Sequence, residues 1–341
     1  MAILVVGGAG YIGSHTARSL RRHGHDVIIF DNLSTGHRFL ADGFELIVGD
    51  IADEEKLAHA LERATAVMHF AAHAYVSESL ENPKKYFRNN VEAALTLLNA
   101  TIAAGVRVFV FSSSCAVYGA PSKIPIPETE SRQPINPYGV SKLFFENALE
   151  AYEYAYGLRS VRLRYFNAAG ADESGEIGER HDPETHLIPL ALAAAAGTGP
   201  ELRVFGTDYP TPDGTCIRDY IHVNDLAEAH VLTLQYLING GAPLALNLGV
   251  GEGYSIEQVL AAVQRVTGSK VPRRMASRRL GDPPALVADP SRAREVLHWK
   301  ASYTLDDIVS TAWKWMQRNA AMKDVASSKS HWADRSLTEV R

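Results

Sequence analysis

The sequence has few cysteines and no long apolar run. Among its 341 residues only Cys115 and Cys216 are cysteines, too few for a disulfide framework and without the spacing of a zinc site. No stretch reaches the roughly 18 consecutive apolar residues that span a membrane, and the N-terminus leads directly into a strand pattern rather than a signal peptide. These absences predict a cytoplasmic protein without a membrane segment or a bound metal.

An excess of charge of either sign is also lacking. The 34 Lys and Arg residues face 39 Asp and Glu residues, and the formal net charge is −5. Because both signs are interspersed, the chain has no electrostatic attraction to nucleic acid or to an anionic membrane. Its 46% hydrophobic residues are enough to bury a substantial core in one large or two modest domains.

The most informative stretch that is present lies at the beginning of the chain. Residues 2–6 are continuously apolar, which predicts a strand buried on both faces, and a glycine-rich turn then opens a helix. Gly8, Gly10 and Gly13 have the GxGxxG spacing, and Gly7 adds a second spacing of three. Glycines suit this turn because the backbone must approach a pyrophosphate held by helix N-terminal amides.

The segments that follow predict a dinucleotide-binding fold. A strand over 26–30 ends in Asp31, 18 residues after Gly13, where a carboxylate accepts hydrogen bonds from an adenosine ribose and favours NAD over NADP. Further strands over 44–51, 66–70, 106–111 and 160–166 alternate with helices, which predicts a doubly wound parallel α/β sheet of the Rossmann type. A long helix after the fourth strand holds Asn90, which could reach the cofactor or bond the backbone.

A candidate catalytic group follows the fifth strand. Pro137 fits the first turn of a helix, so Tyr138 and Lys142, four residues apart, share one face. A neighbouring ammonium and a cationic nicotinamide both lower the tyrosine pKa from about 10, which allows it to act as a base. Ser114, at the end of the fifth strand, could donate to the same substrate oxygen. The alternative, an ordinary surface Tyr and Lys, is disfavoured behind a dinucleotide fold.

The composition changes after residue 170, where an acidic loop with Gly and His leaves the sheet. We expect a Rossmann domain over 1–170 and about 224–250, a smaller α/β substrate domain over 171–223 and about 251–319, and a tail over 320–341. In the second domain we expect helices over 187–196, 256–267 and 305–319, and a basic loop over 273–279.

Six segments carry a family resemblance over about residues 2–318: GGAGYIGSH (7–15), DNLSTGH (31–37), FSSSCAVYG (111–119), NPYGVSK (136–142), YFNAAGA (165–171) and VFGTDYPTPDGTCIRDYIHV (204–223). In combination they resemble the extended short-chain dehydrogenase/reductase family, and within it the UDP-glucose 4-epimerases of the bacterial exopolysaccharide type. The resemblance implies bound NAD, a UDP-sugar substrate and a homodimer. It also implies a mechanism in which C4 of the sugar is oxidised to a ketone and then reduced on its other face.

The resemblance also implies a set of site residues. The catalytic group would be Tyr138, Lys142 and Ser114. NAD would be bound by Gly7, Gly10, Tyr11, Ile12, Gly13, Asp31, Asn32, Ser34, Thr35, Gly36, Asp50, Ile51, Phe70, Ala71, Ala72, Asn90, Ser112, Tyr138, Lys142, Tyr165 and Phe166. The UDP-sugar would be held by Ser114, Tyr138, Asn167, His186, Leu187, Val204, Phe205, Arg218, Arg279, Asp282 and Leu286.

Departures from the family pattern leave the sugar open. Leu286 stands where enzymes restricted to unacetylated hexoses carry a tyrosine, so UDP-GlcNAc and UDP-GalNAc are expected alongside UDP-glucose and UDP-galactose. UDP-xylose and UDP-arabinose form the alternative pair. His186 replaces an asparagine beside the sugar nucleotide. A rival from another class is a non-catalytic NAD-sensing protein, since fold does not fix function, but it has no need of Ser114, Tyr138 and Lys142 together.

Overall fold

The computed structural model describes residues 2–279 and 282–319, and the predicted tail over 320–341 lies outside them. The central sheet contains seven parallel strands in the order β3-β2-β1-β4-β5-β6-β11. This order confirms the doubly wound α/β fold predicted from the sequence. The strands are β1 (Ala2–Val6), β2 (Asp26–Asp31), β3 (Glu45–Val48), β4 (Ala64–His69), β5 (Val108–Ser114), β6 (Arg159–Tyr165) and β11 (Leu244–Leu248).

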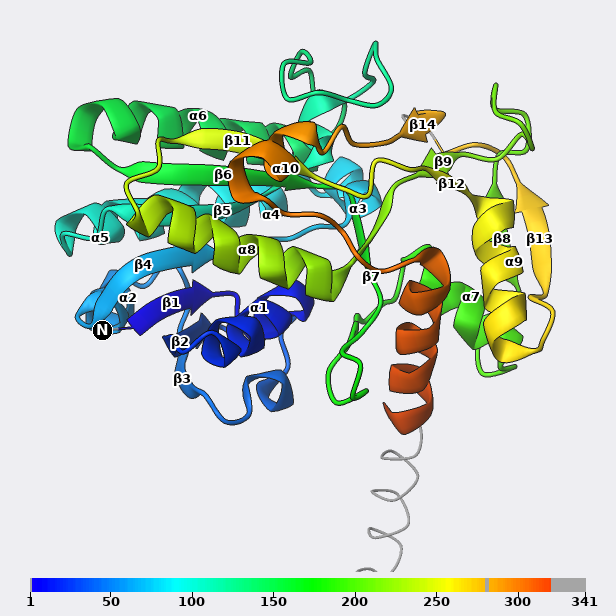
Figure 1. Cartoon of the computed structure of the whole chain (residues 1–341), viewed down its shortest axis with the longest axis horizontal. Helices are drawn as coiled ribbons and strands as arrows, with labels where there is room; N and C mark the ends of the chain where they lie inside the picture. Colours follow the sequence, from blue (N-terminus) through cyan, green and yellow to red (C-terminus); the bar gives the residue numbers. More distant parts are fainter. Residues whose placement is uncertain (1, 280–281, 320–341) are drawn as a thin grey trace, which may run out of the picture.

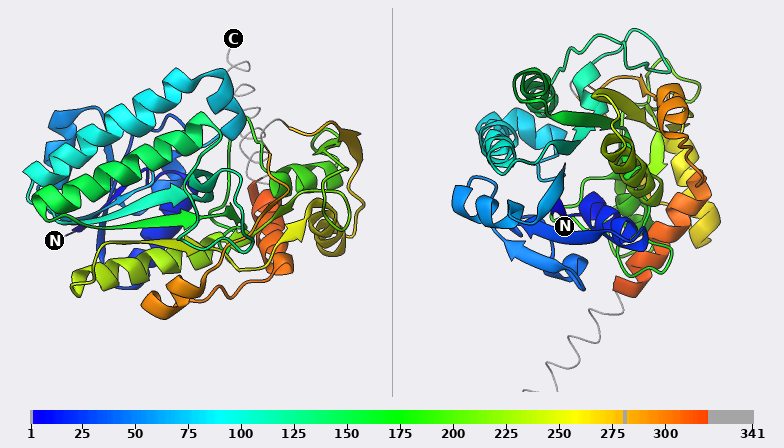
Figure 2. Two further views of the ribbon diagram at one scale, coloured as in Figure 1. Left: turned by 90° about the horizontal axis from the view of Figure 1, so that it is seen from above. Right: turned by 60° about the vertical axis from the view of Figure 1, so that its left-hand side comes forward.

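Helices cover both faces of this sheet (Figure 2). One layer consists of α1 (Tyr11–Arg22), α8 (Val223–Ile238) and α10 (Ser291–Leu297), and the other of α2 (Glu54–Leu61), α5 (Ala94–Ala103) and α6 (Pro137–Tyr156). Each layer buries an apolar face against the sheet, which explains why the central strands are apolar on both sides. Helix α6 begins at Pro137, where the Asn136 side chain accepts the Gly139 amide at 2.8 Å.

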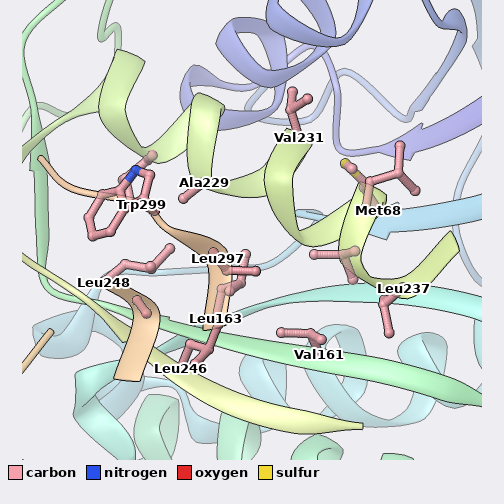
Figure 3. Packing of buried hydrophobic residues seen from close by; sticks show 14 of the residues in the cluster. Met68, Val161, Leu163, Ala229, Val231, Leu237, Leu246, Leu248, Leu297 and Trp299 are labelled. Carbon is pink, nitrogen blue, oxygen red and sulfur yellow. The ribbon is translucent and has the colours of Figure 1, made fainter. Parts of the chain in front are cut away.

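The core under α8 and α10 joins segments far apart in the chain. Met68, Leu163 and Leu246 from the sheet pack with residues of α8 (Figure 3). Leu297 and Trp299 complete this core, and the Trp299 indole nitrogen donates to the Asp225 carbonyl at 3.0 Å. Residues 291–299, expected in the second domain, therefore pack on the Rossmann sheet because their apolar side chains cover β11. The division into two domains remains a prediction.

The remaining elements lie beyond the carboxyl ends of the sheet strands (Figure 1). Among the described residues they include α7 (Leu187–Ala195), α9 (Ile256–Thr267), a helix over residues 305–319 and three small sheets. Among these, β8 (Leu202–Phe205) pairs in parallel with β13 (Arg273–Ala276). The expected loop over 273–279 thus begins as a strand, because β8 offers its backbone a partner. In a second small sheet β7 (Asn167–Ala169) pairs with β10 (Tyr220–His222). In a third, β9 (Ile217–Arg218) lies between β12 (Tyr254–Ser255) and β14 (Ala285–Leu286).

The long helix expected after β4 is divided into several pieces. Helix α3 (Val76–Glu81) ends before Pro83, and α4 (Pro83–Phe87) starts afresh because the Asn82 side chain caps the Lys85 amide at 3.3 Å. A π-helical turn, η2 (Arg88–Ala93), then leads into α5. Short 3-10 turns are η1 (Arg38–Ala41) and η3 (Cys115–Tyr118).

Among the described residues, no helix combines the length and hydrophobicity that a membrane crossing requires.

Candidate active site

The glycine-rich turn forms a cradle with no room for side chains. Gly7 has a φ of +80°, and a Cβ on it would lie 2.4 Å from the Ala71 amide nitrogen. A Cβ on Gly13 would lie 2.3 Å from the Gly7 carbonyl oxygen. Helix α1 begins after Gly10, and no side chain caps its first backbone amides. The amides around Tyr11 and Ile12 therefore face the cradle uncapped. A narrow turn with free helix amides fits a pyrophosphate group.

Asp31 lines one wall of this cradle. Its side chain accepts the Ala9 amide at 2.9 Å and the Leu33 amide at 2.8 Å, and the residue is only 7% exposed. Burial raises the pKa of Asp31, while the two amides oppose the rise. A Cβ on Gly36 would lie 2.8 Å from its carboxylate. The carboxylate is thus placed beside the turn at the end of β2, as a ribose contact requires.

The other predicted adenosine contacts lie on neighbouring loops. The Asn32 amide group donates to Asp50 at 2.8 Å and accepts the Ser34 amide at 3.0 Å, which links the ends of β2 and β3. Ser34 and Thr35 are exposed and Ile51 is buried. The backbone amides of Phe70 and Ala71 both donate to the Val6 carbonyl, at 2.7 and 3.1 Å. The turn that continues to Ala72 is thereby held against the end of β1.

Asn90 was expected either to reach the cofactor or to bond the backbone, and its side chain is hydrogen-bonded to the backbone. Its side chain accepts the His73 amide at 2.9 Å and donates to the His73 carbonyl at 3.0 Å. It also donates to the Ser141 hydroxyl at 3.1 Å. The π-helical turn that holds Asn90 therefore joins the β4 turn to helix α6, which carries Tyr138 and Lys142.

Ser114, Tyr138 and Lys142 come together at the carboxyl end of β5. The Lys142 ammonium donates to the Ser112 carbonyl at 2.8 Å and lies 5.9 Å from the centre of the Tyr138 ring. Burial lowers the pKa of Lys142 to about 7, against the influence of Glu146. Burial also raises the pKa of Tyr138 to about 12, and the Ser114 hydroxyl opposes that rise. The spacing predicted from the sequence therefore places Tyr138 beside Lys142, but in the protein without NAD the pKa of Tyr138 is raised by burial rather than lowered as expected.

Buried polar groups support this pair, and three of them, Ser113, Glu146 and Arg164, were not predicted from the sequence. Glu146, one helical turn after Lys142, accepts the Ser113 hydroxyl at 2.6 Å and two bonds from the Arg164 guanidinium at 2.6 and 2.9 Å. The Ser112 hydroxyl is hydrogen-bonded to the Tyr165 hydroxyl. Together these bonds tie α6 to β5 and β6. The available signal was a carboxylate four residues after Lys142, on the same helical face.

Several predicted UDP-sugar residues gather around β9 and β14. Arg218 is buried and forms an ion pair with Asp282. The Arg279 guanidinium lies 4.1 Å from the centre of the Phe205 ring, and Leu286 pairs with Arg218 in the strand register. Phe166 and Leu286 share a small apolar cluster with Cys115, which adjoins Ser114. Arg218 is thus connected through Leu286 to the apolar cluster that adjoins Ser114.

The other predicted substrate residues are placed differently. The Val204 side chain is 1% exposed in the core with α7 and α9, so the predicted contact of Val204 with the UDP-sugar would be made by its backbone. Strand residues face opposite sides in turn, and Phe205 takes the other side. Leu187 also packs partly against that core, while Asn167 is half-buried in β7.

One predicted NAD residue also reaches the loop that leaves the sheet: the Tyr11 hydroxyl donates to the Gly170 carbonyl at 2.6 Å.

His186 lies in an ionic cluster at the start of α7. Its Nδ1 atom is 2.8 Å from a Glu179 oxygen and 3.1 Å from a Glu184 oxygen. Although burial lowers the pKa of His186, the two carboxylates raise it overall to about 10. His181 contacts the same carboxylates. Of these residues only His186 was predicted from the sequence, because nothing in the spacing showed that four side chains of this loop would converge.

Proteins of similar sequence and fold include UDP-glucose 4-epimerases. A UDP-glucose 4-epimerase from Rhizobium meliloti (strain 1021) is 51% identical over 318 residues, which cover 93% of this chain and 97% of the relative. The crystal structure of UDP-glucose 4-epimerase from Brucella ovis in complex with NAD has a TM-score of 0.90 and 54% identity, covering 92% of this chain and 97% of that one.

A third relative extends the agreement to a sugar nucleotide. The UDP-glucose-4-epimerase from Stenotrophomonas maltophila, crystallised with NAD and formylated UDP-arabinopyranose, has a TM-score of 0.91 and 41% identity, covering 94% of this chain and 99% of that one. The model of the NAD dependent epimerase/dehydratase family matches residues 3–249, which include the glycine-rich turn, Asp31 and the Tyr138–Lys142 pair. The chain therefore belongs to the NAD dependent epimerase/dehydratase family.

Proposed function

We propose that this chain interconverts UDP-glucose and UDP-galactose by NAD-dependent epimerisation at C4 of the sugar. The observation that carries the proposal is the convergence of Ser114, Tyr138 and Lys142 at the sheet edge that holds the glycine-rich turn. UDP-glucose 4-epimerases that are 41–54% identical over more than nine tenths of the chain support the choice of substrate.

Tyr138 serves as the base that takes the proton of the 4-hydroxyl group. The Lys142 ammonium stabilises the phenolate, and its bond to the Ser112 carbonyl holds it 5.9 Å from the ring centre. Ser114 donates a hydrogen bond to the same sugar oxygen. When bound, NAD supplies the acceptor and then the donor of the C4 hydride. Because the ketone must present its other face before it is reduced, the site holds the sugar loosely and the nucleotide firmly.

The cradle residues fit NAD and disfavour NADP. A phosphate on the adenosine ribose would meet the buried Asp31 carboxylate, which two backbone amides hold in place. Gly7, Gly13 and Gly36 leave room for the dinucleotide where a Cβ would clash with the backbone or with Asp31. The purified chain is therefore expected to retain NAD.

Two guanidinium groups suit the diphosphate of the UDP-sugar. Arg218 and Arg279 can each offer two parallel N–H donors to phosphate oxygens, and the Phe205 ring beside Arg279 offers a flat surface to uracil. Asp282 pairs with Arg218 in the free protein and so holds the guanidinium in position. Asn167, His186 and Leu187 complete the proposed substrate contacts.

The decisive test replaces Tyr138 by Phe. Loss of the base should reduce the turnover of UDP-galactose by about 10²–10⁴-fold, while the retained NAD, measured after denaturation, stays at the parent level. Tyr154→Phe is the matched control, because Tyr154 lies on the same helix and is 96% exposed; its turnover should equal that of the parent. Parent-like turnover in Tyr138→Phe would refute the mechanism, and an inactive parent would favour the NAD-sensing alternative.

Leu286 is the proposed determinant of sugar selectivity. It is half-buried beside Phe166 and Cys115, and its side chain is shorter than the tyrosine of strict hexose enzymes. We expect UDP-GlcNAc and UDP-GalNAc to be accepted together with the hexose pair. The arabinose ligand of the Stenotrophomonas structure supports UDP-xylose and UDP-arabinose as the alternative pair.

A kcat/KM series on the three sugar pairs tests this assignment. Leu286→Tyr should lower the rate for the N-acetylated pair relative to UDP-galactose by roughly 10–200-fold, corresponding to about 1–3 kcal/mol of apolar discrimination. Leu286→Met, of similar volume, is the control and should change the ratio little. An unchanged ratio in Leu286→Tyr would show that this position does not select the sugar.

The same proposal includes a homodimer in the cytoplasm. Phe87 on α4, with Val140 and Phe144 on α6, are large apolar side chains that are 39–49% exposed, and a second copy of the chain would bury them. The free thiols of Cys115 and Cys216 agree with a reducing compartment.

A further inference from the structure

Four side chains able to bind a metal converge on the loop that precedes α7. Glu179, His181, Glu184 and His186 each offer one nitrogen or oxygen atom, and these atoms all lie within 4.8 Å of one another. The cysteines have no zinc spacing, and for that reason no metal was predicted from the sequence. The donors gathered here are imidazoles and carboxylates, which also bind transition metals.

Three of the distances between donors are close to those of a tetrahedral coordination shell, in which Glu184 contributes one of its two oxygens and all four donors lie within 4.8 Å of one another. Bonds of about 2.0–2.2 Å to Zn²⁺ place tetrahedral donors roughly 3.4 Å apart. His186 Nδ1 lies 2.8 Å from Glu179 Oε1 and 3.1 Å from Glu184 Oε1. His181 Nδ1 lies 3.3 Å from Glu179 Oε1 and 3.5 Å from Glu184 Oε2. Both imidazoles therefore direct Nδ1 toward the two carboxylates.

Two observations distinguish the cluster from an ion pair at the surface. The Glu179 side chain is only 7% exposed, so the cluster lies below the surface. In the free protein the neighbouring imidazoles compensate the charge of this buried carboxylate, a role that a divalent cation would take over. Within the described part of the chain, His181 Nδ1 is buried and makes no hydrogen bond of standard geometry, although it faces two carboxylates. A shared cation would satisfy this nitrogen and both carboxylates at once.

Backbone amides hold the Glu184 carboxylate in place, and a tryptophan anchors the loop at Glu179. The amides of Thr185 and His186 both donate to Glu184 Oε1 at 2.8 Å. The Trp315 indole donates to the Glu179 carbonyl at 2.8 Å and so anchors the loop to the helix over residues 305–319. Supporting hydrogen bonds of this kind orient the ligands of protein metal sites.

We propose that Glu179, His181, Glu184 and His186 form a binding site for one divalent transition-metal ion, and that Zn²⁺ is the ion their chemistry favours. Two carboxylates balance the charge of a divalent cation, and imidazole selects Zn²⁺ over Mg²⁺ or Ca²⁺. The ion fixes the loop that leads into α7. His186 uses Nδ1 for the metal, which leaves Nε2 for its contact with the UDP-sugar.

The test is Zn²⁺ binding by the full chain after treatment with a chelator and desalting. The parent should retain one Zn²⁺ per chain when one equivalent is added, measured by atomic emission, and Mg²⁺ should not compete. His181→Ala should bind Zn²⁺ at least about tenfold more weakly. His23→Ala removes a histidine that contacts Glu228 elsewhere on the surface, and it should bind Zn²⁺ as the parent does.

Two further measurements separate metal binding from loss of structure. Glu184→Gln keeps the side-chain shape but removes a charge, so it should also lose Zn²⁺ while its circular dichroism stays at that of the parent. Co²⁺ in the parent should give the visible absorption of a tetrahedral site. Zn²⁺ should raise the Tm of the parent and of His23→Ala but not that of His181→Ala. A parent that retains no Zn²⁺, or equal retention in His181→Ala and His23→Ala, would overturn the proposal.

Discussion

At the scale of single residues, the candidate site depends on charges that are buried together. Lys142 lies between the Ser112 carbonyl and the Phe111 ring. Glu146, one helical turn after Lys142 on α6, forms an ion pair with Arg164 on β6. Burial alone would raise the pKa of Glu146, but the Arg164 guanidinium lowers it below its usual value. The ion pair therefore keeps the helix that carries the base in register with β5 and β6.

Removing the charge of Glu146 should strongly destabilise the protein. Glu146→Gln leaves the Arg164 guanidinium buried opposite a neutral amide, which costs about 3–5 kcal/mol in the free energy of unfolding. Glu150→Gln, one turn later and 47% exposed at its side chain, should cost less than about 1 kcal/mol. Urea titration of both variants measures the difference, and equal midpoints would contradict the assigned role of the buried pair.

The pH dependence of the stabilisation by Glu146 follows from the direction in which its pKa is shifted. Because the pKa of Glu146 in the folded protein lies below its ordinary 4.5, its stabilising contribution is complete above that pH and declines as the pH falls through the lowered pKa. The stability gap between the parent and Glu146→Gln should therefore narrow in acid. Urea titrations at neutral and acidic pH test this, and a gap that widens in acid would reverse the assigned sign.

At the scale of elements, the turn between β1 and α1 shows how backbone geometry creates a binding site. Gly7 and Gly24 have nearly the same positive φ, +80° and +81°, but only Gly7 lies against other backbone atoms. Gly24 has open space around its Cα. A side chain would therefore cost a similar amount of conformational energy at Gly7 and at Gly24, but only at Gly7 would it also collide with neighbouring backbone atoms.

Alanine substitutions at these two glycines should have different consequences. Gly24→Ala should cost about 1–2 kcal/mol of stability through its left-handed backbone and should retain NAD. Gly7→Ala should lose bound NAD, because its Cβ would push against Ala71 and open the cradle. Thermal unfolding and the NAD content after purification check both. Full retention of NAD by Gly7→Ala would mean that the turn tolerates a side chain and does not define the pocket.

The elements also show how far the sequence could predict the structure. Local patterns identified the glycine turn, Asp31 and the four-residue spacing of Tyr138 and Lys142, because each depends on neighbours in the chain. The strand over Arg273–Ala276 was missed because it forms only when β8 supplies a partner. The pair between Glu146 and Arg164 was missed because the two residues belong to different elements. Asn90 could not be resolved because its partners lie on the β4 turn and on α6.

At the scale of the whole molecule, the exposed apolar side chains on α4 and α6 are the basis of the proposed dimer. Phe144→Glu should place a charge in the middle of this surface and yield a monomer in light scattering. Ile238→Glu is the matched control, since Ile238 is 52% exposed at the end of α8, on the opposite face of the sheet. A monomeric parent, or a dimer that survives Phe144→Glu, would exclude this interface.

The order of the strands also governs how the chain folds during its synthesis. Strand β6 is bordered on its outer side by β11, which a ribosome reaches only after residues 166–243 have been made. Until then β6 is an open edge, and the apolar side chains of Val161 and Leu163 lack the cover of Leu246 on β11 and of the segment around Trp299. Open strand edges bind other nascent chains. A chain arrested before residue 244 should therefore aggregate or require a chaperone, even though most of its nucleotide-binding residues have already emerged.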